Sequence, residues 1–157
     1  MWQMIDAHFP RRRLIILVLL SMVGLAAATY LMYKHYSIPT GQGFCNLSAT
    51  ISCDIVNQST YAEIYGIPVS GIGALGYVAF FLLSLGLLSG FNFSKINSHL
   101  TVRNVTKVFL LLVFLGLLFS IYLTGVEIFI LYAFCPFCLI QQGVILTMFG
   151  ILVSLPD

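Results

Sequence analysis

Four long apolar runs constrain the fold of this chain more than any other feature of its sequence. They cover residues 14–33, 71–90, 108–134 and 136–155, and only the third contains a charged side chain, Glu127. A helix needs about 20 apolar residues to cross a hydrocarbon core about 30 Å thick. Charged residues make up only 8% of the chain, against about 25% in a soluble domain. The sequence therefore predicts an all-α membrane protein with a bundle of four transmembrane helices.

The chain is short enough for one compact unit, so residues 1–157 are predicted to form a single integral membrane domain. Its net charge of +2 is small and scattered, which argues against nucleic-acid binding. Ala26–Ala28 resembles a signal-peptide cleavage site. The apolar run around it is longer than the about 7–15 residues of a signal sequence, so we expect it to stay as a membrane helix.

The basic residues gather where the positive-inside rule gives an orientation. Arg11–Arg13 precede the first run, and Lys95, Arg103 and Lys107 lie between the second and third runs. Cytoplasmic loops carry the excess of Lys and Arg, so both termini are expected in the cytoplasm. Residues 34–70 then form an extracytoplasmic loop, and all four cysteines lie on the oxidising side of the membrane.

The loop of residues 34–70 is the only sizeable region expected outside the membrane. Glycine and proline residues mark turns near both of its ends. Between these turns, residues 54–57 and 62–65 are predicted to form one or two short amphipathic turns on the membrane surface. A loop of this length in so small a protein is usually functional.

The four cysteines form two pairs on this side of the membrane. Cys135 and Cys138 make a C-x-x-C motif where the fourth helix begins, and Cys45 and Cys53 lie on the loop. Backbone N–H groups at a helix N-terminus stabilise a nearby thiolate, and Pro136 suits the first helical position. A dithiol at this spacing closes a small disulfide ring and reopens by thiolate exchange. The motif therefore predicts a redox-active pair.

Other uses of the cysteines are weighed against that prediction. A static Cys135–Cys138 bridge closes a very small loop and adds little stability. Zinc sites of this kind usually have two C-x-x-C motifs, so no metal is expected. The spacing of Cys45 and Cys53 permits a disulfide without dictating one. Two roles for this pair remain open. It is either a structural disulfide of the loop or a shuttle pair that passes electrons from a soluble dithiol inward.

Three residues with a carboxyl or carboxamide side chain lie inside the apolar runs. Glu127 precedes Cys135 by eight residues, which a continuous helix places about 12 Å deeper in the membrane. An intramembrane ionisable group is a functional candidate, here either a proton donor to a reduced cofactor or a neutral acid that joins two helices. Gln141 and Gln142 follow Cys138 by one turn and offer hydrogen bonds to a polar ligand or to neighbouring helices.

The arrangement of these residues resembles the vitamin K epoxide reductase family, most closely its bacterial and archaeal branch, over about residues 12–155. The matching residues are Cys45, Cys53-Asp54-x-Val56-x-x-Ser59-x-Tyr61, Gly66-Ile67-Pro68-Val69-Ser70, Gly73, Tyr77 and Cys135-x-x-Cys138. The resemblance implies a four-helix bundle around a quinone in a bacterial or archaeal cytoplasmic membrane. It also implies that the C-x-x-C motif lies at the mouth of the bundle, with the loop as a lid.

The resemblance implies a role for each cysteine. Cys138 is the thiol that reacts with the quinone, and Cys135 is its partner, which exchanges with Cys53. Cys45 meets an external dithiol. Many prokaryotic relatives carry a fused thioredoxin-like domain, whereas this chain stops at Asp157. The expected partner is therefore a separate thioredoxin-like dithiol protein.

Further residues near the quinone follow from the same resemblance. Ser59 corresponds to a serine near the reactive centre and Tyr61 to an aromatic position of the lid. Val69 stands where the vertebrate enzymes have an asparagine that hydrogen-bonds vitamin K, and Gln142 stands where they have a tyrosine. Both departures favour ubiquinone or menaquinone over an epoxide.

Together these observations predict a quinone-dependent thiol–disulfide oxidoreductase that promotes disulfide formation. It would oxidise the extracytoplasmic dithiol partner and reduce a membrane quinone. One alternative within enzymes is a reductase of vitamin K quinone or its epoxide. A non-enzymatic alternative is a membrane scaffold with structural disulfides or a metal site.

Overall fold

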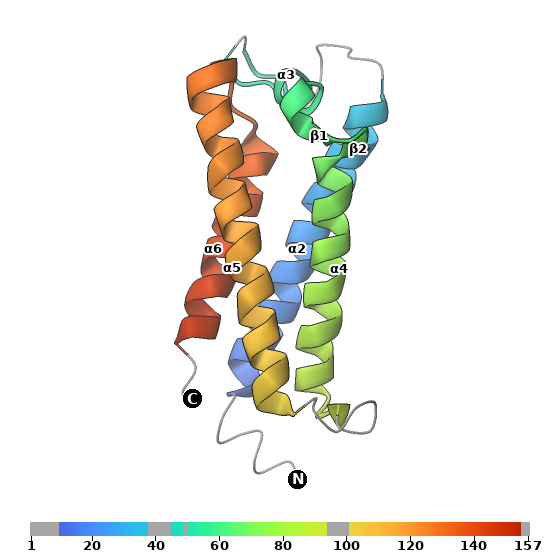
Figure 1. Cartoon of the computed structure of the whole chain (residues 1–157), viewed down its shortest axis with the longest axis vertical. Helices are drawn as coiled ribbons and strands as arrows, with labels where there is room; N and C mark the ends of the chain where they lie inside the picture. Colours follow the sequence, from blue (N-terminus) through green and yellow to red (C-terminus); the bar gives the residue numbers. More distant parts are fainter. Residues whose placement is uncertain (1–9, 38–44, 49, 94–100, 155–157) are drawn as a thin grey trace.

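A computed structural model describes residues 10–37, 45–48, 50–93 and 101–154. Four long helices run alongside one another, and short elements cover one end of the bundle (Figure 1). The long helices are α2 (Arg11–Tyr36), α4 (Val69–Leu88), α5 (Val102–Val126) and α6 (Pro136–Val153). Each lies in a segment long and apolar enough to cross a membrane. The predicted all-α membrane bundle is confirmed.

The end of the third run differs from the prediction. Helix α5 continues into one π-helical turn, η3 (Glu127–Leu131), and Tyr132 then adopts the left-handed conformation with φ 49°. This conformation turns the chain out of the helix, and the Ala133 N–H closes the turn on the carbonyl of Glu127 at 3.2 Å. The helical segment therefore ends at Leu131 and not at residue 134.

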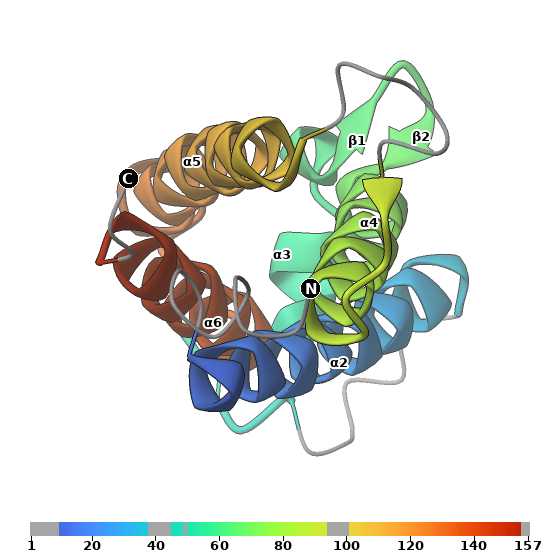
Figure 2. The same cartoon turned by 90° about the horizontal axis from the view of Figure 1, so that it is seen from below.

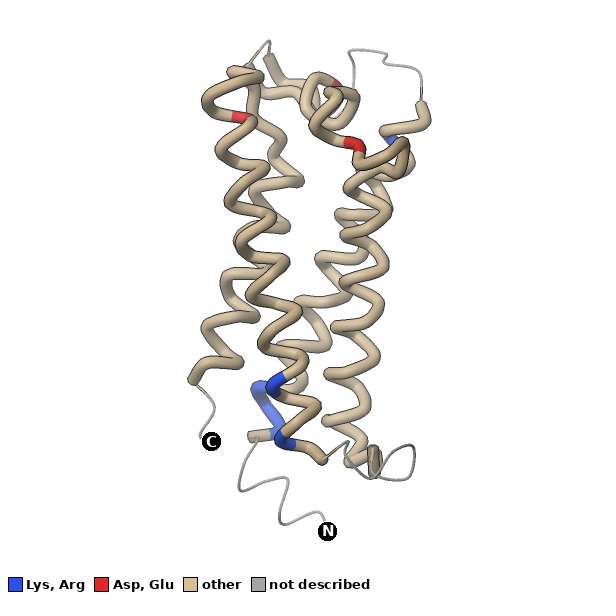
Figure 3. Tube along the Cα trace, viewed as in Figure 1, with Lys and Arg blue, Asp and Glu red and all other residues tan. Residues whose placement is uncertain are grey.

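Charged residues gather at the two ends of the bundle, as the coloured Cα trace in Figure 3 shows. Arg11–Arg13, Arg103 and Lys107 lie at the end where α2 and α5 begin. Arg13 donates to the main-chain oxygen of Ser154 at 2.9 Å and so links the start of α2 to the end of α6. Lys95, which also entered the orientation argument, lies outside the described residues.

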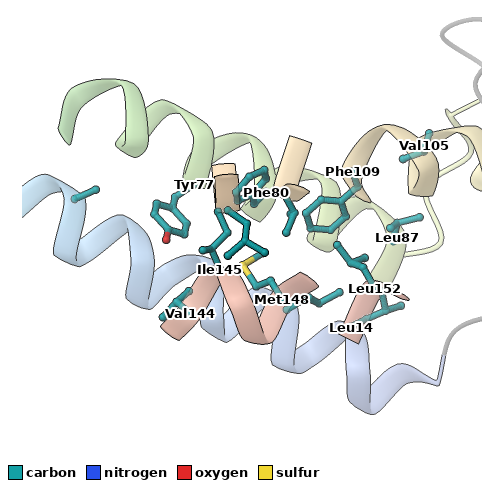
Figure 4. Close-up of a cluster of buried hydrophobic side chains, with 14 residues drawn as sticks. Leu14, Tyr77, Phe80, Leu87, Val105, Phe109, Val144, Ile145, Met148 and Leu152 are labelled. Atoms are coloured by element: carbon teal, nitrogen blue, oxygen red, sulfur yellow. The ribbon is translucent and has the colours of Figure 1, made fainter. Parts of the chain in front are cut away.

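The half of the bundle near this basic end is filled by apolar side chains (Figure 4). Phe109 of α5 and Met148 of α6 are fully buried there. The ring of Phe109 packs against that of Phe80 on α4, with 5.6 Å between centroids. Nearer the other end, Gly24 of α2 leaves room for the ring of Tyr77, which a Cβ at this position would overlap. Such close packing holds helices together in lipid, where the surroundings are equally apolar.

The opposite end is covered by a cap, defined here as residues 45–48 and 50–68. It contains the short helix α3 (Cys53–Asn57), a 3₁₀ turn η1 (Thr60–Ala62) and a hairpin of β1 (Glu63–Ile64) and β2 (Ile67–Pro68). Helix α3 forms where the first turn was predicted in the loop, but it buries Asp54 and Asn57 and leaves Ile55 exposed.

The second predicted turn, at residues 62–65, is wrong, because the chain forms the β1–β2 hairpin there. Tyr65 and Gly66 both have positive φ, 52° and 78°. Two successive residues of this kind make the tight turn that matches the twist of a two-stranded hairpin.

Polar contacts fasten the cap to the last turn of α2. Lys34 pairs with Asp54 at 3.4 Å. The ring of His35 contacts the carbonyl of Asn57 through Nδ1 at 2.6 Å and the carboxylate of Glu63 through Nε2 at 3.3 Å. These contacts hold α3 and the hairpin over the mouth of the bundle.

Candidate functional site

Main-chain hydrogen bonds bring the loop cysteines to the start of α6. Phe134 donates its N–H to the carbonyl of Thr50 at 2.8 Å, and Ser52 donates to the carbonyl of Phe134 at 3.0 Å. This short parallel pairing aligns the segment before Cys53 with the segment before Cys135. The next residue of each segment is therefore a cysteine, and the two cysteines lie side by side.

The two cysteine pairs meet beneath the cap. Cys45 and Cys53 form a disulfide, and Cys135 and Cys138 are free thiols. The Sγ atoms of Cys53 and Cys135 are 3.1 Å apart. Thiolate exchange requires direct approach of one sulfur to another, and this contact supplies it between the two pairs.

The start of α6 is built around Cys135. Pro136 is the first helical residue, as expected, and Cys135 caps the helix by accepting a hydrogen bond from the N–H of Cys138 at 3.4 Å. The partial positive charge of a helix N-terminus favours negative charge on an atom at that place. The helix start therefore lies against the Cys135 sulfur, the sulfur that touches Cys53.

Glu127 lies beside the thiols, so the expectation that it sits deeper in the membrane is wrong. Its side chain is buried, and Oε2 accepts a hydrogen bond from the N–H of Cys135 at 3.1 Å. The π turn and the left-handed Tyr132 fold the chain back, which returns Cys135 to the level of Glu127. The carboxyl group thus joins the end of α5 to the start of α6.

A cavity of about 420 Å³ opens beneath the cap, between α4, α5 and α6. Its wall is mostly apolar. Several candidate site residues predicted from the sequence line it, among them Ser59, Tyr61, Val69, Glu127 and Cys138. Cys138 is the only one of the four cysteines on this wall. The site therefore has a thiol facing the cavity and a buried disulfide behind it.

The two glutamines of α6 have different surroundings. Gln142 is not among the residues lining the cavity, and its Oε1 accepts a hydrogen bond from the hydroxyl of Thr124 at 2.6 Å. Gln141 lines the cavity, and its main-chain carbonyl accepts from the hydroxyl of Tyr77 at 3.3 Å.

Sequence reasoning matched Ser70, Gly73 and Tyr77 to the family, but it did not identify the face of α4 that lines the cavity. Ser70, Gly73, Tyr77 and Phe80 lie on it at intervals of three or four residues, the spacing of one face of a helix. This signal was present in the sequence, but α4 is apolar on all sides, so its periodicity did not distinguish the inner face.

The disulfide of the cap is enclosed in this structure. The side chains of Cys45, Cys53 and Cys135 have no exposed surface. In this conformation the Cys45–Cys53 disulfide is closed to molecules outside the protein. The same three sulfurs lie within 4.8 Å of one another. Two of them share the disulfide, so a metal site here would first require its reduction, because metals bind the thiolate.

Four membrane-spanning helices, a disulfide in contact with a dithiol and an adjoining cavity define an integral membrane protein with a redox-active cysteine centre. The family model of the vitamin K epoxide reductase family matches residues 15–153, nearly the whole chain, and the protein belongs to that family. Membership makes it an oxidoreductase. A sequence search against curated proteins gives no match.

Proposed function

We propose that this protein is a quinone-dependent thiol–disulfide oxidoreductase that generates disulfides. It oxidises a separate thioredoxin-like dithiol protein and reduces ubiquinone or menaquinone. The observation that supports this most strongly is the position of the two C-x-x-C sulfurs. Cys135 touches Cys53 of the loop disulfide at 3.1 Å, while Cys138 lines the cavity.

The cysteines act as a two-step relay. The partner dithiol reduces the Cys45–Cys53 disulfide and becomes a disulfide itself. The Cys53 thiolate then attacks Cys135 of a Cys135–Cys138 disulfide, and Cys138 leaves as a thiolate. Cys45 next attacks Cys53, which restores the loop disulfide and releases Cys135. Two electrons have then moved to the C-x-x-C pair, and this is the redox state in the structure.

The cavity residues fit a quinone. Its volume of about 420 Å³ lies within the range of about 300–1,000 Å³ of small-molecule sites. The wall is mostly apolar, and it includes polar side-chain atoms without protein partners, among them the hydroxyl of Ser70. A bound quinone accepts two electrons and two protons. Cys138 stands on the wall as the electron donor, and the Glu127 carboxyl group beside it holds a proton for transfer.

The charge distribution supports an orientation for this activity. The basic end of the bundle (Figure 3) faces the cytoplasm by the positive-inside rule. Both termini then lie in the cytoplasm, and the cap with its cysteines faces the oxidising compartment outside a bacterial or archaeal cytoplasmic membrane. Disulfides persist in that compartment, where the dithiol partner is to be found.

Two observations bear on the alternative functions. Val69 lies on the cavity wall and offers no side-chain hydrogen bond, which favours a plain quinone over vitamin K epoxide. A scaffold with structural disulfides gives no reason for a free thiol on the wall of a cavity next to the loop disulfide. Turnover with the epoxide would favour the first alternative, and absence of all quinone turnover would favour the second.

Filling the cavity tests the proposal. Gly76 of α4 lines the cavity, and a Cβ at this position meets nothing within 4 Å. Gly76→Leu places a side chain in the proposed quinone site. We expect quinone reduction, followed by absorbance in detergent with a reduced thioredoxin-like donor, to fall at least about tenfold because overpacking a site costs about 1–3 kcal/mol.

Gly150→Leu is the matched control. Gly150 lies on the exposed surface of α6 outside the cavity lining, and a Cβ there also meets nothing within 4 Å. This variant should keep the wild-type rate. Equal rates for the two leucine variants would contradict the assignment of the cavity to the quinone.

A further inference from the structure

Buried polar atoms without partners are unevenly distributed in this protein. Among the residues that the structure describes, three buried side-chain atoms lack a hydrogen-bond partner, and these are the Ser70 and Ser84 hydroxyls and Gln141 Nε2. Ser70 and Gln141 both line the cavity, whereas Ser84 does not. A buried polar atom without a partner is destabilising, so two such atoms on one cavity wall indicate a ligand that satisfies them.

The positions of these two residues relate them to Cys138. Gln141 follows Cys138 by three residues on α6, so both lie on one face of the helix. Helical side chains lean toward the N-terminus, which directs the carboxamide of Gln141 toward the level of Cys138. The main chain of Gln141 is held by the hydroxyl of Tyr77 at 3.3 Å. Ser70 lies in the first turn of α4, at the same end of the bundle (Figure 1).

We propose that Gln141 and Ser70 are positioning residues that hydrogen-bond the two oxygens of the quinone head and hold it beside Cys138. This inference rests on the proposed quinone-reducing function. An amide N–H₂ only donates, so Gln141 selects a carbonyl oxygen or another acceptor. A hydroxyl both donates and accepts, so Ser70 binds the second oxygen before and after its reduction. Donors on two helices fit a head with two separated oxygens.

The assignment differs from the two positions that the family resemblance emphasised. Val69 has no polar side-chain atom to offer. The carboxamide oxygen of Gln142 is bound by Thr124 at 2.6 Å, and Gln142 does not line the cavity. The neighbouring residues, Ser70 and Gln141, have the unpartnered atoms instead. Each hydrogen-bonding position is thus shifted by one residue in this chain.

Equilibrium binding tests the assignment without requiring turnover. The dissociation constant of a short-chain ubiquinone is measured for the full chain in detergent, with Gln141→Met and Ser70→Ala beside wild type. Loss of one hydrogen bond should weaken binding roughly three- to tenfold in each variant. Ser84→Ala is the control. It removes the third unpartnered atom, which lies on α4 like that of Ser70 but outside the cavity lining, and it should leave the dissociation constant unchanged.

Two further measurements separate binding from folding. Without quinone, the melting temperature of each variant should equal or exceed that of wild type, because replacing an unsatisfied polar atom by an apolar group removes its desolvation penalty. An alkylbenzene with the same tail has no oxygens to bind. Wild type should prefer the quinone over this compound, and Gln141→Met should reduce the preference.

The outcomes distinguish this inference from the function on which it rests. Unchanged quinone affinity in both Gln141→Met and Ser70→Ala, with wild type binding normally, would overturn the positioning roles and leave the proposed function standing. Weakening by Gln142→Met alone would also overturn them. Failure of wild type to bind the quinone would overturn both. If Gln141→Met does not fold, the result for Ser70→Ala decides by the same criterion.

Discussion

Replacing Cys138 with serine is expected to reduce quinone reduction to below about 1% of the wild-type rate. Cys138 is the only cysteine on the cavity wall, and a serine hydroxyl forms no disulfide with Cys135. Transition-state stabilisation supplied by a residue that takes part in the reaction is lost with that residue. Absorbance of ubiquinone or menaquinone during turnover measures the effect, with both a protein dithiol and a small dithiol as donor.

The Cys138→Ser variant is informative because the change in shape is small. Serine differs from cysteine by one atom, so the bundle should melt near the wild-type temperature, which circular dichroism in detergent checks. A folded variant that reduces quinone at a rate near that of wild type would show that another group delivers the electrons. A wild-type protein with no turnover would instead favour a structural role for the disulfides.

Replacing Cys45 with serine is expected to separate the two kinds of donor. With a thioredoxin-like protein as donor, quinone reduction should fall at least about tenfold, because the loop disulfide that receives its electrons no longer forms. With a small dithiol, turnover should persist, because such a molecule can enter the cavity on whose wall Cys138 lies. The ratio of the two initial rates, measured on one preparation, is the readout.

Two outcomes of the Cys45→Ser comparison would contradict the shuttle. Equal loss with both donors would argue against a shuttle and would make the Cys45–Cys53 disulfide a structural staple of the cap. Equal retention with both donors would mean that the protein dithiol reaches the C-x-x-C pair directly. That route is hard to reconcile with Cys135, whose side chain has no exposed surface under the cap.

The sequence predicted the architecture well because lipid solvation acts on composition more than on detailed pattern. Runs of about 20 apolar residues must form helices in a membrane, and the structure has a helix in each of the four runs. The ends of the helices and the turns of the loop were less predictable. The π turn at Glu127–Leu131 and the left-handed Tyr132 have no signature in an apolar run. The Tyr65–Gly66 hairpin turn likewise went unrecognised.

The candidate site was predicted in part for related reasons. Cysteine spacing located the two pairs, but their contact depends on the pairing of Ser52 with Phe134 at 3.0 Å, which involves main-chain atoms and so has no residue signature. The position of Glu127 beside Cys135 depends on the π turn and the left-handed Tyr132 that follow it. The proposed roles of Ser70 and Gln141 at the cavity required knowledge of which polar atoms lack partners, and this depends on the whole packed structure.

The most direct test of the relay is to identify the disulfide that forms when Cys138 is absent. In Cys138→Ser, attack of the Cys135 thiolate on Cys53 breaks one disulfide, forms another and frees Cys45, with no external oxidant. Acid quenching, thiol alkylation and peptide mass mapping measure the products, with Cys135→Ser as control. The relay predicts a Cys53–Cys135 disulfide that is enriched over wild type and absent from the control. Finding only Cys45–Cys53 in Cys138→Ser, with Cys135 always alkylated, would contradict it.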